Sequence, residues 1–253
     1  MRPALAPAAV GDSLLVVALV LAVAAVHLLP DEIPVSSGLS RHSLLSTAGG
    51  VSVVYAFLHM FPELDERRES LEGLDVLVGT LAAHHIYALA FVGVALFYGL
   101  ERLATLSKAH EFEHGLPPFT DEPVFWLHVG SFVVYNAFIG YVIVQGETGA
   151  DSAALFAVAM GLHLLGNDAA LEAHHRETYR RIGRWVLAAA VVAGAGVGAV
   201  YTLGEGTFTV LLGLLTGGVV FNAIKDELPR TAESRFWAFA AGATGYALVL
   251  LSL

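Results

Sequence analysis

Apolar residues gather along this chain in eight long stretches, and most polar residues lie between them. A bilayer core of about 30 Å requires about 20 mostly apolar residues in each helix that crosses it. The stretches are close to that length, so the pattern predicts an all-α polytopic membrane protein with eight transmembrane helices. The predicted spans are Ser13–Leu29, Ser43–Phe61, Leu81–Leu100, Pro123–Val144, Ser152–Leu171, Ile182–Leu203, Phe208–Ile224 and Phe236–Leu251.

The composition agrees with a membrane protein. Hydrophobic residues make up 56% of the 253 residues and charged residues only 14%, below the roughly 25% that is typical of a soluble domain. The predicted loops are short, so we expect residues 1–253 to form a single transmembrane domain. The net charge of -10 argues against a nucleic-acid partner and is suited to attracting cations. The chain has no cysteine, which excludes thiolate metal sites.

Basic residues are distributed unequally between the two sides of the predicted membrane. Ten lie in the loops after the first, third, fifth and seventh spans, and three lie on the opposite side. Because cytoplasmic loops carry the excess of Lys and Arg, the first group is predicted to be cytoplasmic. Both termini then lie outside, and we expect a location in the cell membrane. The ten are Arg41, Arg102, Lys108, Arg176, Arg180, Arg181, Arg184, Lys225, Arg230 and Arg235; the three are Arg2, Arg67 and Arg68.

The second and seventh spans end in similar sequences. Gly49–Val51 precedes Pro62 in one, Gly217–Val219 precedes Pro229 in the other, and an alanine lies six residues before each proline. With the orientation above, these two spans run in opposite directions. Transporters often contain inverted repeats of this kind, with the substrate site at the midplane between them. The alternative is that both short patterns are simply common in membrane helices.

The polar residues inside the spans cluster in the fourth and fifth. His163 and Asn167 are four residues apart and share one helical face, with Asp168 beside them. Imidazole, amide and carboxylate groups together make a candidate site for a divalent cation such as Zn²⁺. For His163 or Asn136 alone, the alternative is a structural hydrogen bond between helices. The fourth span contributes His128, Ser131, Tyr135 and Asn136, and the fifth contributes His163, Asn167, Asp168 and, at its end, Glu172, His174 and His175.

The topology and two helix-end motifs resemble the ZIP family of divalent-metal transporters. That family has eight helices in a 3+2+3 inverted-repeat arrangement, both termini outside and an often His-bearing cytoplasmic loop after the third span. Its second span typically ends in a His-x-x-Pro-Glu-like motif, as His59–Glu63 does here. Its seventh typically ends in an Asp-x-Leu-Pro-like motif, as Asp226–Pro229 does. The expected third loop includes His110–His114, and the resemblance covers nearly the whole chain.

The resemblance implies a metal site in the fourth and fifth spans. The family's fourth span carries His-Asn-x-x-Asp-Gly, of which Tyr135–Gly140 keeps the Asn and the Gly. Its fifth span carries His-Glu-x-x-His-Glu, of which His163–Asp168 keeps the first His and the final acid. Because other ligands of a two-metal site are replaced, the implied site is mononuclear. Its ligands would be Asn136, His163, Asn167 and Asp168.

Eight further residues are candidates for the ion pathway or a secondary role. His59 and Glu63 are four apart at a helix end, where a local hydrogen bond is the alternative. Lys225 is expected to snorkel to the cytoplasmic interface, or alternatively to reach inward to Asp226 or to an acid of the fifth span. The loop histidines are expected to be solvated rather than metal-sensing. The eight are His59, Glu63, His128, Glu172, Lys225, Asp226, His110 and His114.

We therefore expect a transporter that moves zinc or a similar divalent cation, and not an enzyme. The metal ion would be its substrate, with no certain cofactor. The expected partners are the metal ion and the lipid bilayer, with a homodimer as a further candidate and no nucleic acid. One alternative is an intramembrane zinc-dependent hydrolase, although the sequence contains no His-Glu-x-x-His or Gly-x-Ser-x-Gly motif. The other is a ZIP-like membrane protein that has lost transport.

Overall fold

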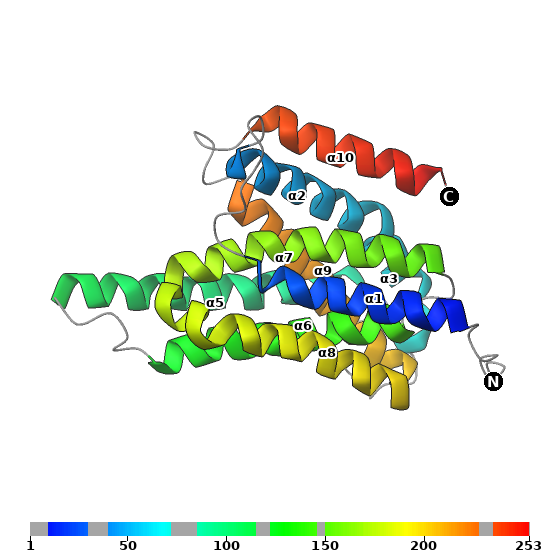
Figure 1. The fold of residues 1–253 in the computed structure, drawn as a ribbon, viewed down its shortest axis with the longest axis horizontal. Helices are drawn as coiled ribbons and strands as arrows, with labels where there is room; N and C mark the ends of the chain where they lie inside the picture. The colour runs from blue at the N-terminus through cyan, green and yellow to red at the C-terminus, as the bar shows by residue number, and fades with distance from the viewer. Residues whose placement is uncertain are drawn as a thin grey trace.

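The computed structural model describes residues 10–29, 40–71, 85–114, 122–145, 150–227 and 235–252, which form a helical bundle without strands (Figure 1). The helices of the first half are α1 (Val10–Val26), α2 (Arg41–Tyr55), α3 (Phe61–Glu66), α5 (Tyr87–His114) and α6 (Glu122–Gln145). Those of the second half are α7 (Ala150–Thr178), α8 (Arg184–Val200), α9 (Glu205–Glu227) and α10 (Phe236–Leu251). Short π-helical turns, η1 (Ala56–Met60) and η3 (Tyr179–Gly183), and a 3-10 turn, η2 (Arg68–Leu71), complete the described elements.

Each of the eight predicted spans is helical over most of its described residues, and residues 81–84 of the third span lie outside the described residues. Among the described residues, six helical stretches are long and apolar enough to cross a membrane, and two apolar helices are shorter. The 16 residues of α10 extend only about 24 Å at about 1.5 Å per residue, less than the bilayer core. The prediction of an all-α chain is confirmed, and the apolar helices are those of an integral membrane protein. The six are Arg41–Glu66, Tyr87–Leu106, Val124–Gln145, Ser152–Glu172, Tyr179–Val200 and Glu205–Lys225.

The backbone after the third span differs from the prediction. A loop was expected to hold His110 and His114, but α5 continues as a helix to His114. The reason is local, because residues 101–114 contain no Gly or Pro, and the first helix breakers are Gly115 and Pro117. The side chains of His110 and His114 lie outside the described residues, so their expected role stays a prediction.

The connection between the fifth and sixth spans is also helical. The fifth span was predicted to end at Leu171, whereas α7 continues to Thr178 and leads through η3 directly into α8. Residues 172–178 again contain no Gly or Pro. The chain nevertheless reverses direction at η3. The following helix, α8, runs antiparallel to α7 and packs alongside α6 (Figure 1). A π-helical turn such as η3 accommodates an irregular backbone and often marks a functional position.

Successive long helices alternate in direction, so α1 begins and α10 ends at the same end of the bundle (Figure 1). Arg41 begins α2, Arg184 begins α8, and Lys225 lies near the end of α9, all at the opposite end. Arg67 and Arg68 follow α3 at the end where α1 begins. The described basic residues therefore divide between the two ends as the sequence predicted. Which end faces the cytoplasm stays a prediction.

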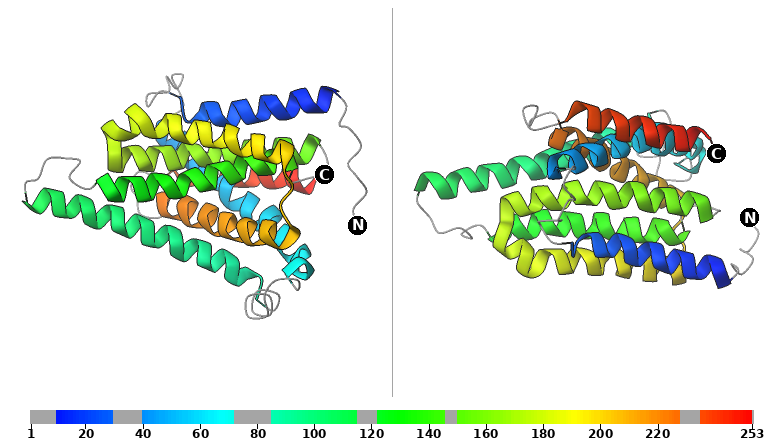
Figure 2. Two further views of the ribbon diagram at one scale, coloured as in Figure 1. Left: turned by 90° about the horizontal axis from the view of Figure 1, so that it is seen from below. Right: turned by 45° about the horizontal axis from the view of Figure 1, so that its top comes forward.

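The long helices pack as two groups of four. One contains α1, α6, α7 and α8, and the other contains α2, α5, α9 and α10 (Figure 2). In the first, a Cβ on Gly194 would lie 1.8 Å from the carbonyl oxygen of Ala137, and one on Gly140 1.9 Å from that of Val191. Glycine is therefore required where α6 and α8 approach each other. Close glycine contacts also join α2 to α10, at Gly50 and Gly242, and α5 to α9, at Gly93 and Gly217.

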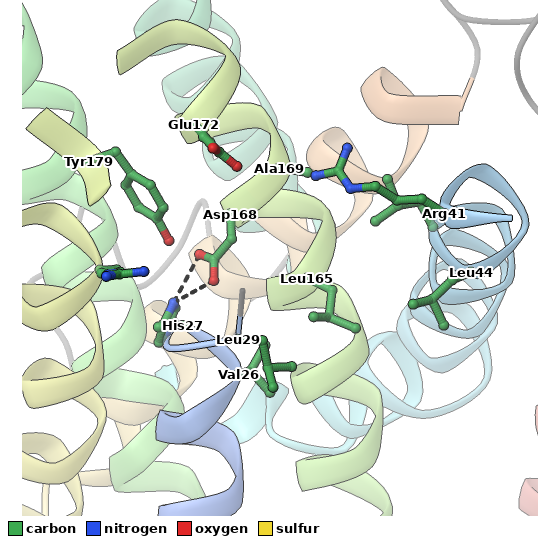
Figure 3. Close-up of a pocket in the computed structure, with 12 residues that line it drawn as sticks. Val26, His27, Leu29, Arg41, Leu44, Leu165, Asp168, Ala169, Glu172 and Tyr179 are labelled. Carbon is green, nitrogen blue, oxygen red and sulfur yellow. Dashed lines mark hydrogen bonds and ion pairs between the residues drawn. The ribbon is translucent and has the colours of Figure 1, made fainter. Parts of the chain in front are cut away.

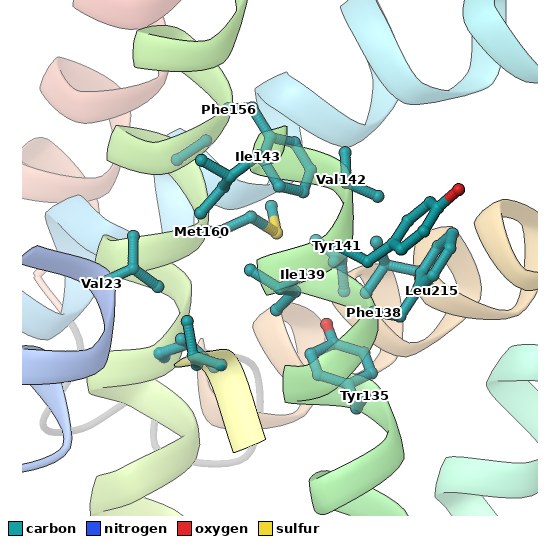
Figure 4. Close-up of a cluster of buried hydrophobic side chains, with 14 of the residues drawn as sticks. Val23, Tyr135, Phe138, Ile139, Tyr141, Val142, Ile143, Phe156, Met160 and Leu215 are labelled. Atoms are coloured by element: carbon teal, nitrogen blue, oxygen red, sulfur yellow. The ribbon is translucent and has the colours of Figure 1, made fainter. Parts of the chain in front are cut away.

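The apolar core lies where α6 and α7 meet. Ile139 and Met160 are fully buried there, and Phe156 and Leu215 pack against the same cluster (Figure 4). These core residues of α6 and α7 occupy the halves of those helices nearer the end where α1 begins. Tyr135, Asn136 and His163 lie near the middle of α6 and α7, and Asn167 and Asp168 lie about one turn further along α7 toward the arginine-rich end.

Candidate functional site

His27 joins three helices at the centre of the polar region. It follows α1 directly, and its side chain is 0% exposed. Its Nδ1 lies 2.9 and 3.0 Å from the two carboxylate oxygens of Asp168 on α7. Its Nε2 lies 2.9 Å from Oδ1 of Asn136 on α6. The imidazole therefore bridges the two helices that were predicted to hold a metal ion.

Both ring nitrogens of His27 face hydrogen-bond acceptors. The Asn136 amide nitrogen donates to the Phe132 carbonyl oxygen at 2.8 Å, which turns the amide oxygen toward His27. Asp168 presents a carboxylate to the other ring nitrogen. Two acceptors facing both ring nitrogens match an imidazolium, in which both nitrogens donate. The contact with Asp168 is then an ion pair that also contains a hydrogen bond.

A second polar group lies beside the first. The Nε2 of His163 on α7 lies 2.8 Å from the Tyr135 hydroxyl oxygen and 3.1 Å from the Asn167 amide nitrogen. All three residues are buried. His163 and Asn167 are one helical turn apart on α7, as their spacing predicted. Asn136 and Asp168, the immediate sequence neighbours of Tyr135 and Asn167, belong to the His27 group.

A small pocket leads from the arginine-rich end of the bundle to Asp168. It has a cavity volume of about 50 Å³ and lies between the end of α1, the start of α2, α7 and η3 (Figure 3). The Asp168 side chain is 14% exposed, whereas that of His27 is fully buried. His27 also lines this pocket, beside the partly exposed Asp168. Glu172, one turn further along α7, lines the same pocket and pairs with Arg180 at 2.6 Å.

The four predicted metal ligands are thus neighbours on α6 and α7, but they are divided between the two polar groups. Asn136 and Asp168 contact His27, while His163 and Asn167 contact each other. Within the described part of the chain, no three His, Asp or Glu side chains are grouped closely enough to hold a metal ion. A cation at this position would therefore need amide oxygens as ligands or a rearrangement of His27.

The predicted secondary residues are spread over the fold. At the end of the bundle where α1 begins, His59 stacks on Tyr55 with ring centroids 4.8 Å apart, and Glu63 pairs with Arg67. His128 is buried on α6, where its ring lies 5.5 Å from that of Phe132. Glu63 therefore has a local ion pair and His59 a local ring contact, and a role of either residue in the ion pathway stays a prediction.

Lys225 pairs with a residue that the sequence analysis did not consider. Its Nζ lies 3.0 Å from Glu101 Oε2, which links α9 to α5. The two side chains are 18% and 20% exposed, so neither is deeply buried. Glu101 rather than an acid of α7 supplies the ion pair that the structure describes. The Asp226 side chain, the other expected partner, lies outside the described residues.

His27 was not among the predicted site residues, although the sequence contains a signal for it. His27 is the only ionisable residue within the predicted span Ser13–Leu29. An ionisable side chain inside a membrane span usually faces protein and has a function, so His27 was a candidate site residue on this ground alone. Its partners were not predictable, because Asn136 and Asp168 are 109 and 141 residues away in the sequence.

Comparisons with known proteins do not identify the chain. No model of a protein family matches the sequence, and no curated protein matches it either. The proposals that follow rest on the residues and geometry described above.

Proposed function

We propose that this chain is a membrane transporter of a divalent cation, with one ion site between α6 and α7. The observation that carries the proposal is the convergence of Asn136 and Asp168 on His27, beside the buried pair His163 and Asn167. Ionisable and amide side chains inside membrane helices are costly, and they mark ion or substrate pathways. Five such side chains, those of His27, Asn136, His163, Asn167 and Asp168, meet where α1, α6 and α7 approach one another.

The chemistry of these side chains suits a single cation. One carboxylate, two amide oxygens and two imidazoles provide oxygen and nitrogen ligands, the classes that bind Zn²⁺ and other first-row metals. With one carboxylate, the site would neutralise only part of the charge of a divalent ion. The ion would replace His27 between Asn136 and Asp168, or His27 would turn to become a ligand. The pocket at Asp168 provides an approach from one end of the bundle.

The helix pairing supports a ZIP-like 3+2+3 inverted repeat as part of this proposal. The expected symmetry exchanges the first span with the sixth, the second with the seventh, the third with the eighth and the fourth with the fifth. Spans one, four, five and six are α1, α6, α7 and α8, so under this symmetry the contact between α6 and α8 corresponds to the contact between α7 and α1. The same symmetry converts the contact of α2 with α10 into that of α9 with α5. All four contacts are present among the described helices.

A second candidate is a ZIP-like protein that no longer transports. The observation that favours it is the position of His27, whose two ring nitrogens are both engaged between Asn136 and Asp168. An imidazolium there supplies the positive charge that a metal ion would bring. In this case the His27 bridge holds α1, α6 and α7 together, and the site has become structural.

Uptake into reconstituted vesicles distinguishes the two candidates. Zn²⁺ and Mn²⁺ entry would be followed with a trapped fluorescent indicator for the wild type, Asp168→Asn and the control Asp65→Asn. Asp65 is an exposed acid at the other end of the bundle. We expect uptake by the wild type and the control, and a loss of more than about tenfold in Asp168→Asn, since a charge-assisted contact contributes at least about 1.4 kcal/mol. Absence of uptake by the folded wild type would favour the second candidate.

A further inference from the structure

Asn222 on α9 is a buried amide that was not among the predicted site residues. It is only 2% exposed, and its Nδ2 has no hydrogen-bond partner among the described residues. The Nδ2 of Asn136, by contrast, donates to the Phe132 carbonyl oxygen. Buried polar groups nearly always have a partner, because leaving one unsatisfied is costly. The Asn222 amide therefore indicates a bound group that completes its surroundings.

Two residues on the same face of α9 place Asn222 beside the candidate ion site. Leu215, seven residues earlier, packs into the apolar core at α6 and α7 (Figure 4). Gly218, one turn earlier, lies against Tyr135, since a Cβ on Gly218 would be 2.9 Å from the Tyr135 ring. The Tyr135 hydroxyl in turn lies 2.8 Å from Nε2 of His163. Asn222 therefore faces α6 and α7, next to the His163 group.

The groups around Asn222 suit a cation better than an anion. Lys225, three residues further along α9, has its Nζ 3.0 Å from Glu101 Oε2, so a carboxylate balances its charge. His163 and Asn167 on α7 bring an imidazole nitrogen and an amide oxygen. Both are ligand types for divalent cations. A cation between α7 and α9 would therefore meet suitable ligands and no uncompensated charge from Lys225.

We propose that Asn222 is a further ligand of the cation, so that α9 provides part of the ion site. This inference rests on the proposed cation transport. A half-turn of the amide about the Cβ–Cγ bond exchanges Nδ2 with Oδ1 and presents the oxygen to the ion. Three amide oxygens, from Asn136, Asn167 and Asn222, then accompany the Asp168 carboxylate. Oxygen ligands of this kind favour Mn²⁺, whereas imidazole suits Zn²⁺, so Asn222 shifts the preference of the site toward Mn²⁺.

The first test measures ion binding through the melting temperature of the full chain in detergent. Manganese chloride would be added, with sodium chloride at equal ionic strength as the reference. At about ten times its dissociation constant, Mn²⁺ should raise the melting temperature of the wild type by about 3–5 °C. Asn222→Leu should lose most of this rise. Its melting temperature without Mn²⁺ should not fall, because the Asn222 amide nitrogen has no protein partner among the described residues.

A second variant and a matched control separate a ligand from a packing residue. Asn222→Asp adds a buried carboxylate, so it should be less stable than the wild type without Mn²⁺ and should gain a larger rise with it. The control is Thr216→Val on the same helix. Thr216 is buried, and its hydroxyl donates to the Leu212 carbonyl oxygen at 2.7 Å. An equal loss of the rise in this control, or an unchanged rise in Asn222→Leu, would refute the role of Asn222 and leave an amide that holds water.

Uptake into reconstituted vesicles separates a failure of this inference from a failure of the proposed function. Asn222→Leu should reduce Mn²⁺ entry by about tenfold or more, and Zn²⁺ entry by less. Equal uptake by Asn222→Leu and the wild type would reject the ligand and leave transport in place. No uptake by the wild type, together with a Mn²⁺-dependent rise that Asn222→Leu abolishes, would reject transport and retain the ligand. Neither uptake nor a rise in the wild type would overturn both.

Discussion

Two ion pairs connect helices that are distant in sequence, and they differ in depth. His27 and Asp168 join α1 to α7 with side chains 0% and 14% exposed, and the His27 ring also binds Asn136. Lys225 and Glu101 join α9 to α5 with side chains 18% and 20% exposed near the helix ends. The first pair belongs to a hydrogen-bonded group inside the bundle, whereas the second lies where long side chains reach the interface.

The difference in depth determines what each pair contributes. Removing one partner of a buried pair leaves an uncompensated charge away from water, which costs about 3–5 kcal/mol. Pairs that solvent can reach contribute about 0–1 kcal/mol. The ion pair near the candidate ion site should therefore matter most for stability. The pair that involves the more obvious cation, Lys225, should matter less. Four substitutions test this order.

The largest effect is expected for His27→Leu. It removes the bridge and leaves the Asp168 carboxylate without its cation, which should lower the unfolding free energy by about 3 kcal/mol. We choose the lower limit because the Asp168 side chain is partly exposed. Unfolding in detergent, followed by tryptophan fluorescence, measures the change. Adding Asp168→Asn to this variant should restore part of the loss, since no charge then remains. A loss no larger than that of Lys225→Met would contradict the comparison.

Tyr135→Phe should have an intermediate effect. It removes the hydroxyl that contacts His163 and keeps the aromatic ring against Phe97 and Phe132. A buried hydrogen bond between neutral groups contributes about 1 kcal/mol, so the unfolding free energy should fall by about that amount. The same unfolding measurement applies. An unchanged stability would mean that water or another group replaces the hydroxyl at His163.

Lys225→Met should lower the unfolding free energy by less than about 1 kcal/mol, because its pair with Glu101 is partly exposed. Lys225→Arg should lower it less still, since the charge is kept. Measurements at low and high salt sharpen the test, because salt screens an exposed pair more than a buried one. A loss near 3 kcal/mol that is insensitive to salt would place Lys225 in the same class as His27.

The smallest effect is expected for Asp65→Asn. Asp65 pairs with Arg68 at 2.7 Å, but both side chains are almost half exposed. Asp65 and Arg68 are three residues apart in the sequence, and exposed ion pairs at this spacing contribute a few tenths of a kcal/mol at most. Its melting temperature should match that of the wild type within error. A clear drop would mean that this end of the bundle depends on charges more than the geometry indicates.

The positions of the helices followed from local properties of the sequence. Apolar runs located the eight long helices among the described residues, because a membrane helix satisfies its backbone hydrogen bonds within its own segment. The predicted boundaries were least accurate where polar residues without Gly or Pro continued a helix, as after Leu100 and Leu171. There hydropathy indicates the end of the membrane span, whereas helix propensity determines the end of the helix.

For the candidate site, the sequence by itself determined which helices are polar and which residues share a face. Asn136, His163, Asn167 and Asp168 lie on α6 and α7 as predicted. Only the tertiary structure decided that the first helix inserts His27 between two of them, and that Glu101 rather than an acid of α7 pairs with Lys225. These contacts join residues more than 100 positions apart. Spacing along one helix cannot predict such contacts, because they depend on how closely the helices approach at glycines such as Gly140 and Gly194.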